Sequence, residues 1–201
     1  MTTSEPVRAS DPQPAVDAPT TGTHVADAPA SIAPDTKDWT WVLDQRCPEC
    51  GFTAGDVAPG AIAATVRELV PRWVGALHRP GTWARSEPTT WSVLEYGAHV
   101  RDVHRVMLGR LDAMLVDDDP LFANWDQDAT AIDDRYDLQD PATVAIELTA
   151  AAELIAARFD GVRPGEWERP GRRSNGSRFT VRTLGLYFLH DVIHHLHDVR
   201  A

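Results

Sequence analysis

Apolar residues recur at helical spacing in four segments of the chain. In the first, residues 60–77, they stand at every third or fourth position: Ile62, Val66, Leu69, Trp73 and Leu77. This spacing places them on one face of a helix. The second segment opens with Ser92 and, three residues later, Glu95, the pattern of a capping box. We therefore expect a second helix from Ser92 to about Val116.

The third and fourth segments also carry start signals. Asp140 stands before Pro141, a residue favoured in the first turn of a helix, and the apolar positions continue to about Phe159. Thr180 is the N-cap that we assign to the last helix, which extends to the C-terminus. No segment alternates apolar and polar residues as a strand would. The pattern predicts an all-α protein, a four-helix bundle.

The region before the first helix has a different composition. Residues 1–37 hold six prolines and few large apolar side chains. Such a segment buries too little surface to offset the entropy lost on ordering, so we expect a disordered tail at 1–37 and one domain at 38–201. No apolar run approaches the 18 or so residues of a membrane span, and the N-terminus lacks the pattern of a signal peptide. We expect a cytoplasmic protein that contacts no membrane.

The formal net charge of −11 is unevenly distributed. Residues 112–140 contain ten aspartates and one arginine, a local charge of −9, whereas the rest of 38–201 sums to +1. The interpretation we favour for 112–140 is a solvated acidic loop. An excess of acid argues against nucleic-acid binding, which depends on lysine and arginine. Of the 19 basic residues only Lys37 is lysine, a bias typical of GC-rich bacterial genomes.

Histidines give the strongest chemical signal. His190 and His194 lie one turn apart on the last predicted helix, about 40° from each other around its axis, and His197 falls in the same sector. Two inward-facing imidazoles one turn apart can hold a divalent metal. A third ligand would come from the second helix, where His104 points into the apolar stripe and His99 lies at its edge. Geometry alone leaves both candidates open.

A longer stretch around His99 points to a family. The run Trp91-Ser-Val-Leu-Glu-Tyr-Gly-Ala-His99-Val-Arg-Asp102, followed by His190-x-x-x-His194, resembles the DinB-like superfamily. These bacterial four-helix metalloproteins include bacillithiol S-transferases and are similar to the N-terminal domain of mycothiol-dependent maleylpyruvate isomerase. The resemblance, which covers residues 38–201, implies one divalent metal, zinc or nickel, bound by His99, His190 and His194. His104 is then a core histidine.

Other residues are candidates for supporting roles. Asp102, one turn after His99, is placed to orient an imidazole. Trp125 and Asp126 are candidates for the mouth of a metal pocket, as is His197, and Arg173 for binding an anionic group. The string His190-Asp191-x-x-His194 also resembles a zincin motif, but Asp191 points about 100° away from His190, which disfavours a protease.

Two cysteines precede the first helix. Cys47 and Cys50 form a C-x-x-C, which without two further ligands is half of a structural zinc site. A redox dithiol is a second interpretation, and a reduced pair without special chemistry is the plainest.

Together these features suggest an enzyme. Three histidines leave an open position on a metal, and a metal there lowers the pKa of a bound water or thiol. The favoured hypothesis is a mycothiol-type S-transferase acting on an electrophilic small molecule. The alternatives are a metal-dependent hydrolase that uses metal-bound hydroxide, or a non-catalytic stress-response or interaction module. We expect a monomer or homodimer.

Overall fold

The computed structural model describes Met1, Ile32 and residues 38–201. The tail expected at 1–37 therefore lies outside the described residues, apart from those two positions. In the described part of the chain no helix is long and apolar enough to cross a membrane.

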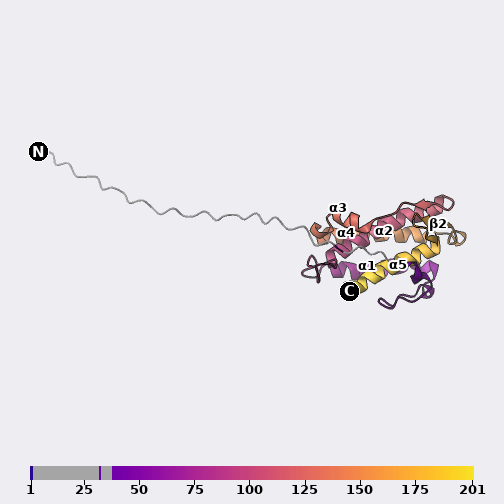
Figure 1. The fold of residues 1–201 in the computed structure, drawn as a ribbon, viewed down its shortest axis with the longest axis horizontal. Helices are drawn as coiled ribbons and strands as arrows, with labels where there is room; N and C mark the ends of the chain where they lie inside the picture. Colours follow the sequence, from indigo (N-terminus) through magenta and orange to yellow (C-terminus); the bar gives the residue numbers. More distant parts are fainter. Residues whose placement is uncertain (2–31, 33–37) are drawn as a thin grey trace.

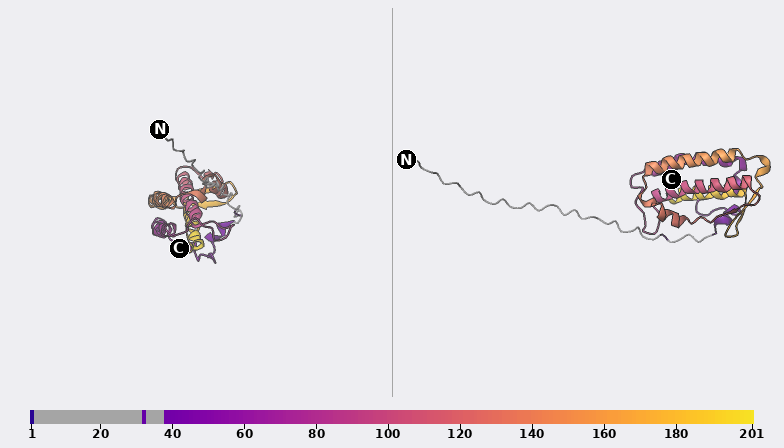
Figure 2. Two further views of the ribbon diagram at one scale, coloured as in Figure 1. Left: turned by 90° about the vertical axis from the view of Figure 1, so that its left-hand side faces the viewer. Right: turned by 90° about the horizontal axis from the view of Figure 1, so that it is seen from above.

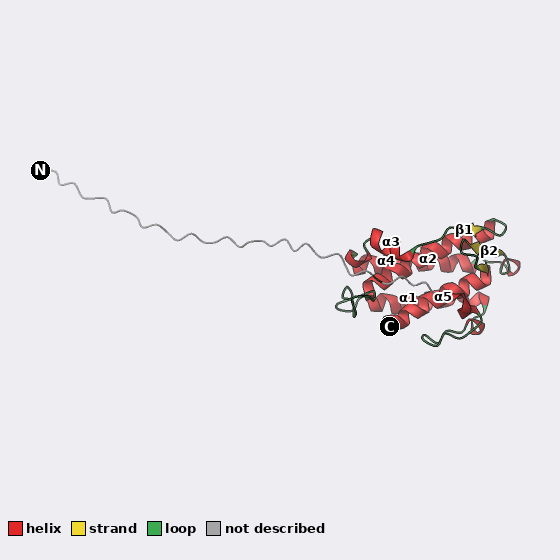
Figure 3. Ribbon diagram, in the orientation of Figure 1, coloured by secondary structure: helices red, strands yellow, loops and turns green. Residues whose placement is uncertain are grey.

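Four long helices build the body of the protein, and Figures 1 and 3 show them running alongside one another. Their bounds are α1 Ile62–Leu77, α2 Val93–Val116, α4 Pro141–Asp160 and α5 Val181–Asp198. Helix α4 contacts α1 and α2 most extensively, while α5 contacts α2 and α1. The end-on view in Figure 2 shows α1 and α4 on one side and α2 and α5 on the other. The predicted all-α four-helix bundle is confirmed.

Local capping explains where these helices begin. The Ser92 side chain accepts a hydrogen bond from the backbone N–H of Glu95, and the N–H of Ser92 donates to the Glu95 carboxylate at 2.8 Å. Asp140 caps α4 through the N–H of Thr143 at 2.8 Å. Thr180 caps α5 in the same way. Each cap satisfies N–H groups that have no partner inside the helix.

The core lies between the four helices, and His104 is packed within it. His104 is buried, and its Nδ1 donates to the Val100 carbonyl at 2.6 Å while its ring packs edge-on against Phe188. Burial lowers the pKa of His104 to about 4, so the ring is neutral at physiological pH. His104 is therefore a core histidine, as expected.

A small sheet at one end of the bundle departs from the expectation that no strand would form (Figure 3). It contains β1 Leu121–Phe122, β2 Pro170–Arg173 and β3 Arg178–Thr180 in that spatial order. Strands β1 and β2 are parallel, and β2 and β3 form an antiparallel hairpin. Strands this short are below the length at which alternation becomes visible in a sequence. Gly171 fits here because a Cβ would lie 2.6 Å from the Phe122 ring.

The acidic segment 112–140 is more ordered than a solvated loop. It contains β1, the short helix α3 Gln127–Asp133 and the 3₁₀ turn η4 Tyr136–Leu138. Asp126 caps α3 by accepting from two backbone N–H groups. Further 3₁₀ turns are η1 Trp39–Leu43, η2 Ala54–Asp56, η3 Pro59–Ala61 and η5 Pro164–Glu166. Turns η1 and η2 contact α5 from outside the bundle and, with the loop between them, form an N-terminal strap at residues 38–56.

Candidate metal centre

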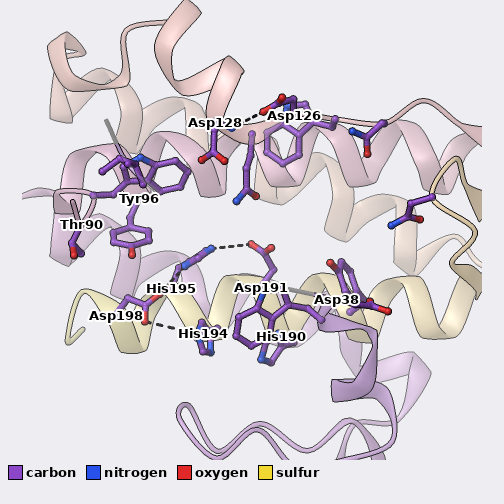
Figure 4. A pocket seen from close by; sticks show the side chains of 18 of the residues that line it. Asp38, Thr90, Tyr96, Asp126, Asp128, His190, Asp191, His194, His195 and Asp198 are labelled. Carbon is purple, nitrogen blue, oxygen red and sulfur yellow. Dashed lines mark hydrogen bonds and ion pairs between the residues drawn. The ribbon is translucent and has the colours of Figure 1, made fainter. Parts of the chain in front are cut away.

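The last helix presents metal-binding side chains in two directions. Figure 4 shows Asp191 and His195 reaching from α5 toward α2, while the rings of His190 and His194 lie on the side of the N-terminal strap. The members of each pair, Asp191 with His195 and His190 with His194, are four residues apart, which is about one helical turn. The two pairs are rotated from each other by about 100° around the axis of α5. Within the described residues, two separate groups of side chains have ligand atoms close enough to share an ion.

The first group joins α2 to α5. It consists of His99, Asp191 and His195, whose ligand atoms all lie within 4.8 Å of one another. Oδ1 of Asp191 is 3.6 Å from Nε2 of His99 and 3.7 Å from Nε2 of His195. Both distances are longer than the donor–acceptor distance of a hydrogen bond. In a tetrahedral site with metal–ligand bonds of about 2.1 Å, two ligand atoms lie about 3.4 Å apart, and both measured distances are close to this value.

Several buried polar atoms at this group lack hydrogen-bond partners among the described residues. Both ring nitrogens of His99 and Oδ1 of Asp191 have no hydrogen-bond partner among the described residues. Burial lowers the pKa of His99, which keeps its ring neutral as metal binding requires. Burial acts to raise the pKa of Asp191, but the imidazoles of His99 and His195 outweigh it and hold that pKa at about 2. The group thus combines the neutral His99 ring, the His195 ring and one carboxylate, a donor set that fits a divalent ion.

Neighbouring side chains hold two of these ligands in place. Nδ1 of His195 hydrogen-bonds to the Asp198 carboxylate at 2.8 Å, which directs Nε2 of the same ring toward Asp191. This carboxylate–histidine pairing is common around bound metals. The Trp125 ring stacks on His99 with a centroid distance of 5.5 Å and nearly parallel planes.

The second group joins the N-terminal strap to α5. It consists of Cys47, Cys50, His190 and His194, also within 4.8 Å of one another. Sγ of Cys47 lies 3.7 Å from Nδ1 of His194, and both cysteines are free. Burial lowers the pKa of His190 to about 4 and also lowers that of His194. Burial and the adjacent Cys47 raise the pKa of the Cys50 thiol to about 11.

The predicted set of three histidine ligands is therefore not brought together. His99 lies with Asp191 and His195, whereas His190 and His194 lie with the two cysteines. The sequence contains a second i, i+4 pair, Asp191 and His195, which a pattern of histidines alone does not include. Asp191 does point away from His190, as expected, but it points toward His99.

Asp191 and His195 of the first group line a pocket of about 520 Å³, and His190 and His194 also line it (Figure 4). Trp125, Asp126 and Arg173 also line it. Trp39 and Tyr96 add aromatic surface. Arg173 is the one arginine among the described lining residues, and its Nε has no hydrogen-bond partner there.

Two of the expected supporting residues lie elsewhere. Asp102 accepts hydrogen bonds from Arg101, Arg105 and the Tyr136 hydroxyl, the last at 2.6 Å, and makes none with His99. Its contacts tie α2 to η4 and, through the arginines, to α4. His197 is largely exposed and lines a separate hollow beside Cys50. Neither residue belongs to the pocket.

Comparisons with known proteins agree with this architecture. A model of the DinB superfamily matches residues 64–199. The structure of YfiT from Bacillus subtilis, described as a probable metal-dependent hydrolase with an unusual four-helix bundle topology, is similar with a TM-score of 0.62. The two are 17% identical, and the match covers 69% of this chain and 82% of YfiT, a likeness that shows the fold. A search of curated proteins gave no match.

Proposed function

This chain belongs to the DinB superfamily, and on that premise we propose that it is a metal-dependent S-transferase that joins a low-molecular-weight thiol to an electrophilic small molecule. His99, Asp191 and His195 would hold one divalent ion, zinc or nickel. The observation that carries the proposal is this group of three ligands: buried atoms of His99 and Asp191 lack hydrogen-bond partners among the described residues, and Asp191 and His195 line an open pocket. An ion bound there would lower the pKa of a thiol or water that entered the pocket.

The protein's own residues supply orientation and shielding. Asp198 accepts a hydrogen bond from Nδ1–H of His195. This hydrogen bond keeps the lone pair on Nε2 of the same ring directed at the site. Trp125 covers one face of His99 and excludes water from it. In the transfer, a sulfur–carbon bond forms as the bond to the leaving group breaks. The thiol proton passes to solvent through the open face of the pocket.

The pocket lining favours one kind of thiol. The described lining residues include one arginine, Arg173, and five aspartates: Asp38, Asp126, Asp128, Asp191 and Asp198. This excess of negative charge would repel a thiol that carries several carboxylates, such as glutathione. Tryptophan rings offer flat surfaces for the faces of sugar rings, while carboxylates and amides accept hydrogen bonds from hydroxyl groups. These features suit a sugar-bearing thiol without net negative charge, and mycothiol has this chemistry.

Hydrolysis is the second candidate, favoured by the donor set itself. Two histidines and a carboxylate are the ligands of several zinc hydrolases, and the fold is shared with YfiT, described as a probable metal-dependent hydrolase. A water molecule would then take the place of the thiol in the pocket.

One assay separates the two candidates. Protein loaded with zinc or nickel is mixed with mycothiol and monochlorobimane, and in parallel with nitrophenyl esters without thiol. We expect metal-dependent release of chloride and formation of the thioether, faster with mycothiol than with glutathione. His99→Ala should abolish this activity and His197→Ala should leave it unchanged. Ester hydrolysis with no thiol conjugation would favour the hydrolase, and neither activity in metal-loaded protein would overturn both.

A further inference from the structure

The group formed by the two cysteines and the other histidine pair is not needed for the proposed reaction. Cys47, His190 and His194 are buried, and Cys50 is half-buried. Their ligand atoms form a compact set that is separate from the group of His99, Asp191 and His195, although His190 and His194 also line the pocket. The fold therefore brings together four metal-binding side chains from two distant parts of the chain.

The distances in this group fit a tetrahedral zinc ion. Zinc bonds of about 2.3 Å to sulfur and about 2.0 Å to nitrogen place a sulfur and a nitrogen about 3.5 Å apart in tetrahedral geometry. Sγ of Cys47 and Nδ1 of His194 are 3.7 Å apart. The spacing of the ligands in the chain, C-x₂-C and H-x₃-H, is also the one found in Cys₂His₂ zinc sites.

The backbone around the cysteines forms a fixed turn. The N–H of Gly51 donates to the Cys47 carbonyl at 3.0 Å, and the N–H of Cys47 donates to the Phe52 carbonyl at 2.8 Å. Gly51 has a φ of +78°, a conformation that glycine adopts without strain. A Cβ at Gly51 would also lie 2.9 Å from a guanidinium nitrogen of Arg46. The turn thereby holds both sulfur atoms near the same point.

Charge and hydrogen bonding also favour an ion. Two thiolates and two neutral imidazoles balance a dication, so the complex carries no net charge into the protein interior. Nε2 of His190 is buried without a hydrogen-bond partner among the described residues. Nε2 of His194 lies 3.5 Å from the Glu49 carboxylate, which is positioned to orient that ring while Nδ1 faces the sulfur.

We infer that Cys47, Cys50, His190 and His194 form a second, structural zinc site, distinct from the ion proposed for the pocket. Four protein ligands fill a tetrahedral ion and leave no position for substrate, so this site is closed. Its role is to fasten the N-terminal strap to α5. Trp39 on that strap packs against the rings of His190 and His194 at 5.5 and 4.9 Å and lines the pocket. The structural ion would thus hold one wall of the pocket in place.

Cobalt provides a probe that reads the two sites separately. The full chain is loaded with Co²⁺. The number of cobalt ions per chain and the absorption spectrum are then measured for the wild type and for the four variants described below. Thiolate ligands give cobalt an intense charge-transfer band in the near ultraviolet, which histidine and carboxylate ligands do not give. We expect two cobalt ions per wild-type chain and a strong thiolate band.

The variants then identify the ligands. His99→Ala should lose one ion and keep the band, whatever the outcome for the proposed enzyme activity. The double variant Cys47→Ser/Cys50→Ser should lose the band and one ion, and His190→Ala should weaken or shift the band. His197→Ala, an exposed histidine on the same helix, is the matched control and should match the wild type.

Three results would overturn the inference. The first is a wild-type protein, reduced before loading, that shows no thiolate band. The second is a His190→Ala spectrum identical to that of the wild type, because the histidine would then not be a ligand. The third is recovery of Cys47 and Cys50 as a disulfide from freshly purified protein, which would make them a redox pair. The first and third need no variant, so a cysteine variant that fails to fold leaves the test intact.

Discussion

His194 and His195 are neighbours in the chain, but their rings face different clusters. The ring centroids are 6.0 Å apart and the ring planes differ by 71°. Nδ1 of His194 faces the sulfur of Cys47, whereas Nε2 of His195 faces the carboxylate of Asp191. Because one residue turns a helix by about 100°, adjacent histidines on α5 can serve two sites.

Asp191 is expected to be a metal ligand in the pocket. The substitution Asp191→Asn keeps the size of the side chain but removes the negative charge between the two imidazoles. We expect the affinity of the pocket for zinc to fall at least about tenfold and activity to fall with it. The thiolate–cobalt band should remain. Competition titration with a coloured chelator measures the affinity, and unchanged zinc affinity would remove Asp191 from the ligand set.

Asp198 is expected to position His195 without touching the ion. Asp198→Ala removes the acceptor of the Nδ1 proton, and loss of such a partner weakens metal binding or activity about 10- to 100-fold. Glu49 lies nearer to Nε2 of His194 than Asp198 does, at 3.5 against 3.9 Å, so the thiolate–cobalt band should persist. His197→Ala serves as the control on the same helix. A variant that loses both ions would show that Asp198 supports the whole helix end instead.

Tyr136 and Asp102 should matter for stability and not for metal binding. The Tyr136 hydroxyl donates to Asp102 at 2.6 Å in a buried position. Tyr136→Phe should lower the free energy of unfolding by about 2 kcal/mol, because a buried hydrogen bond to a charged group is lost. A double-mutant cycle with Asp102→Asn, measured by urea unfolding, isolates this contact. A tenfold loss of pocket metal affinity without loss of stability would instead restore Asp102 as a metal-orienting residue.

Glu95 gives the fold a defined acid sensitivity. Burial acts to raise the pKa of Glu95, but hydrogen bonds from Arg85 and Ser92 outweigh it and hold that pKa below the ordinary glutamate value. A carboxyl group with a lowered folded-state pKa stabilises the fold above the ordinary value of about 4.3, and this stabilisation disappears as pH falls through the folded-state pKa.

The variant Glu95→Gln removes this titration. At about pH 7 the wild type should have the higher free energy of unfolding. Its advantage over the variant should shrink as the pH is lowered below about 4. Urea unfolding at several pH values measures it. A difference that stays constant with pH would mean that the Glu95 charge contributes nothing to stability.

The helices could be predicted from the sequence because their start signals are local. Ser92 with Glu95, and Asp140 with Pro141, act within one turn, and α2 and α4 begin where these residues predict. The small sheet could not be predicted in this way, because the β1–β2 pairing joins segments about 50 residues apart and the strands of the local β2–β3 hairpin are too short to show alternation. Gly171 is required there because Phe122 and Met114 approach it from a distant part of the chain.

The candidate site was predicted in part, for a similar reason. The sequence shows that α5 carries two i, i+4 pairs, but not which pair faces α2. That depends on the rotation of α5 in the bundle, which the packing of all four helices determines. A shift of one residue exchanges His190 and His194 for Asp191 and His195 beside His99. The cysteine–histidine group left a detectable signal, since C-x₂-C and H-x₃-H together have zinc-site spacing.

The most direct test is the location of the bound ions. A crystal of zinc-loaded protein, with anomalous diffraction recorded at the zinc edge, shows each ion and its ligands. We predict one ion held by His99, Asp191 and His195 in the pocket and a second held by the two cysteines with His190 and His194. A single ion bound by His99 together with His190 and His194 would contradict this assignment.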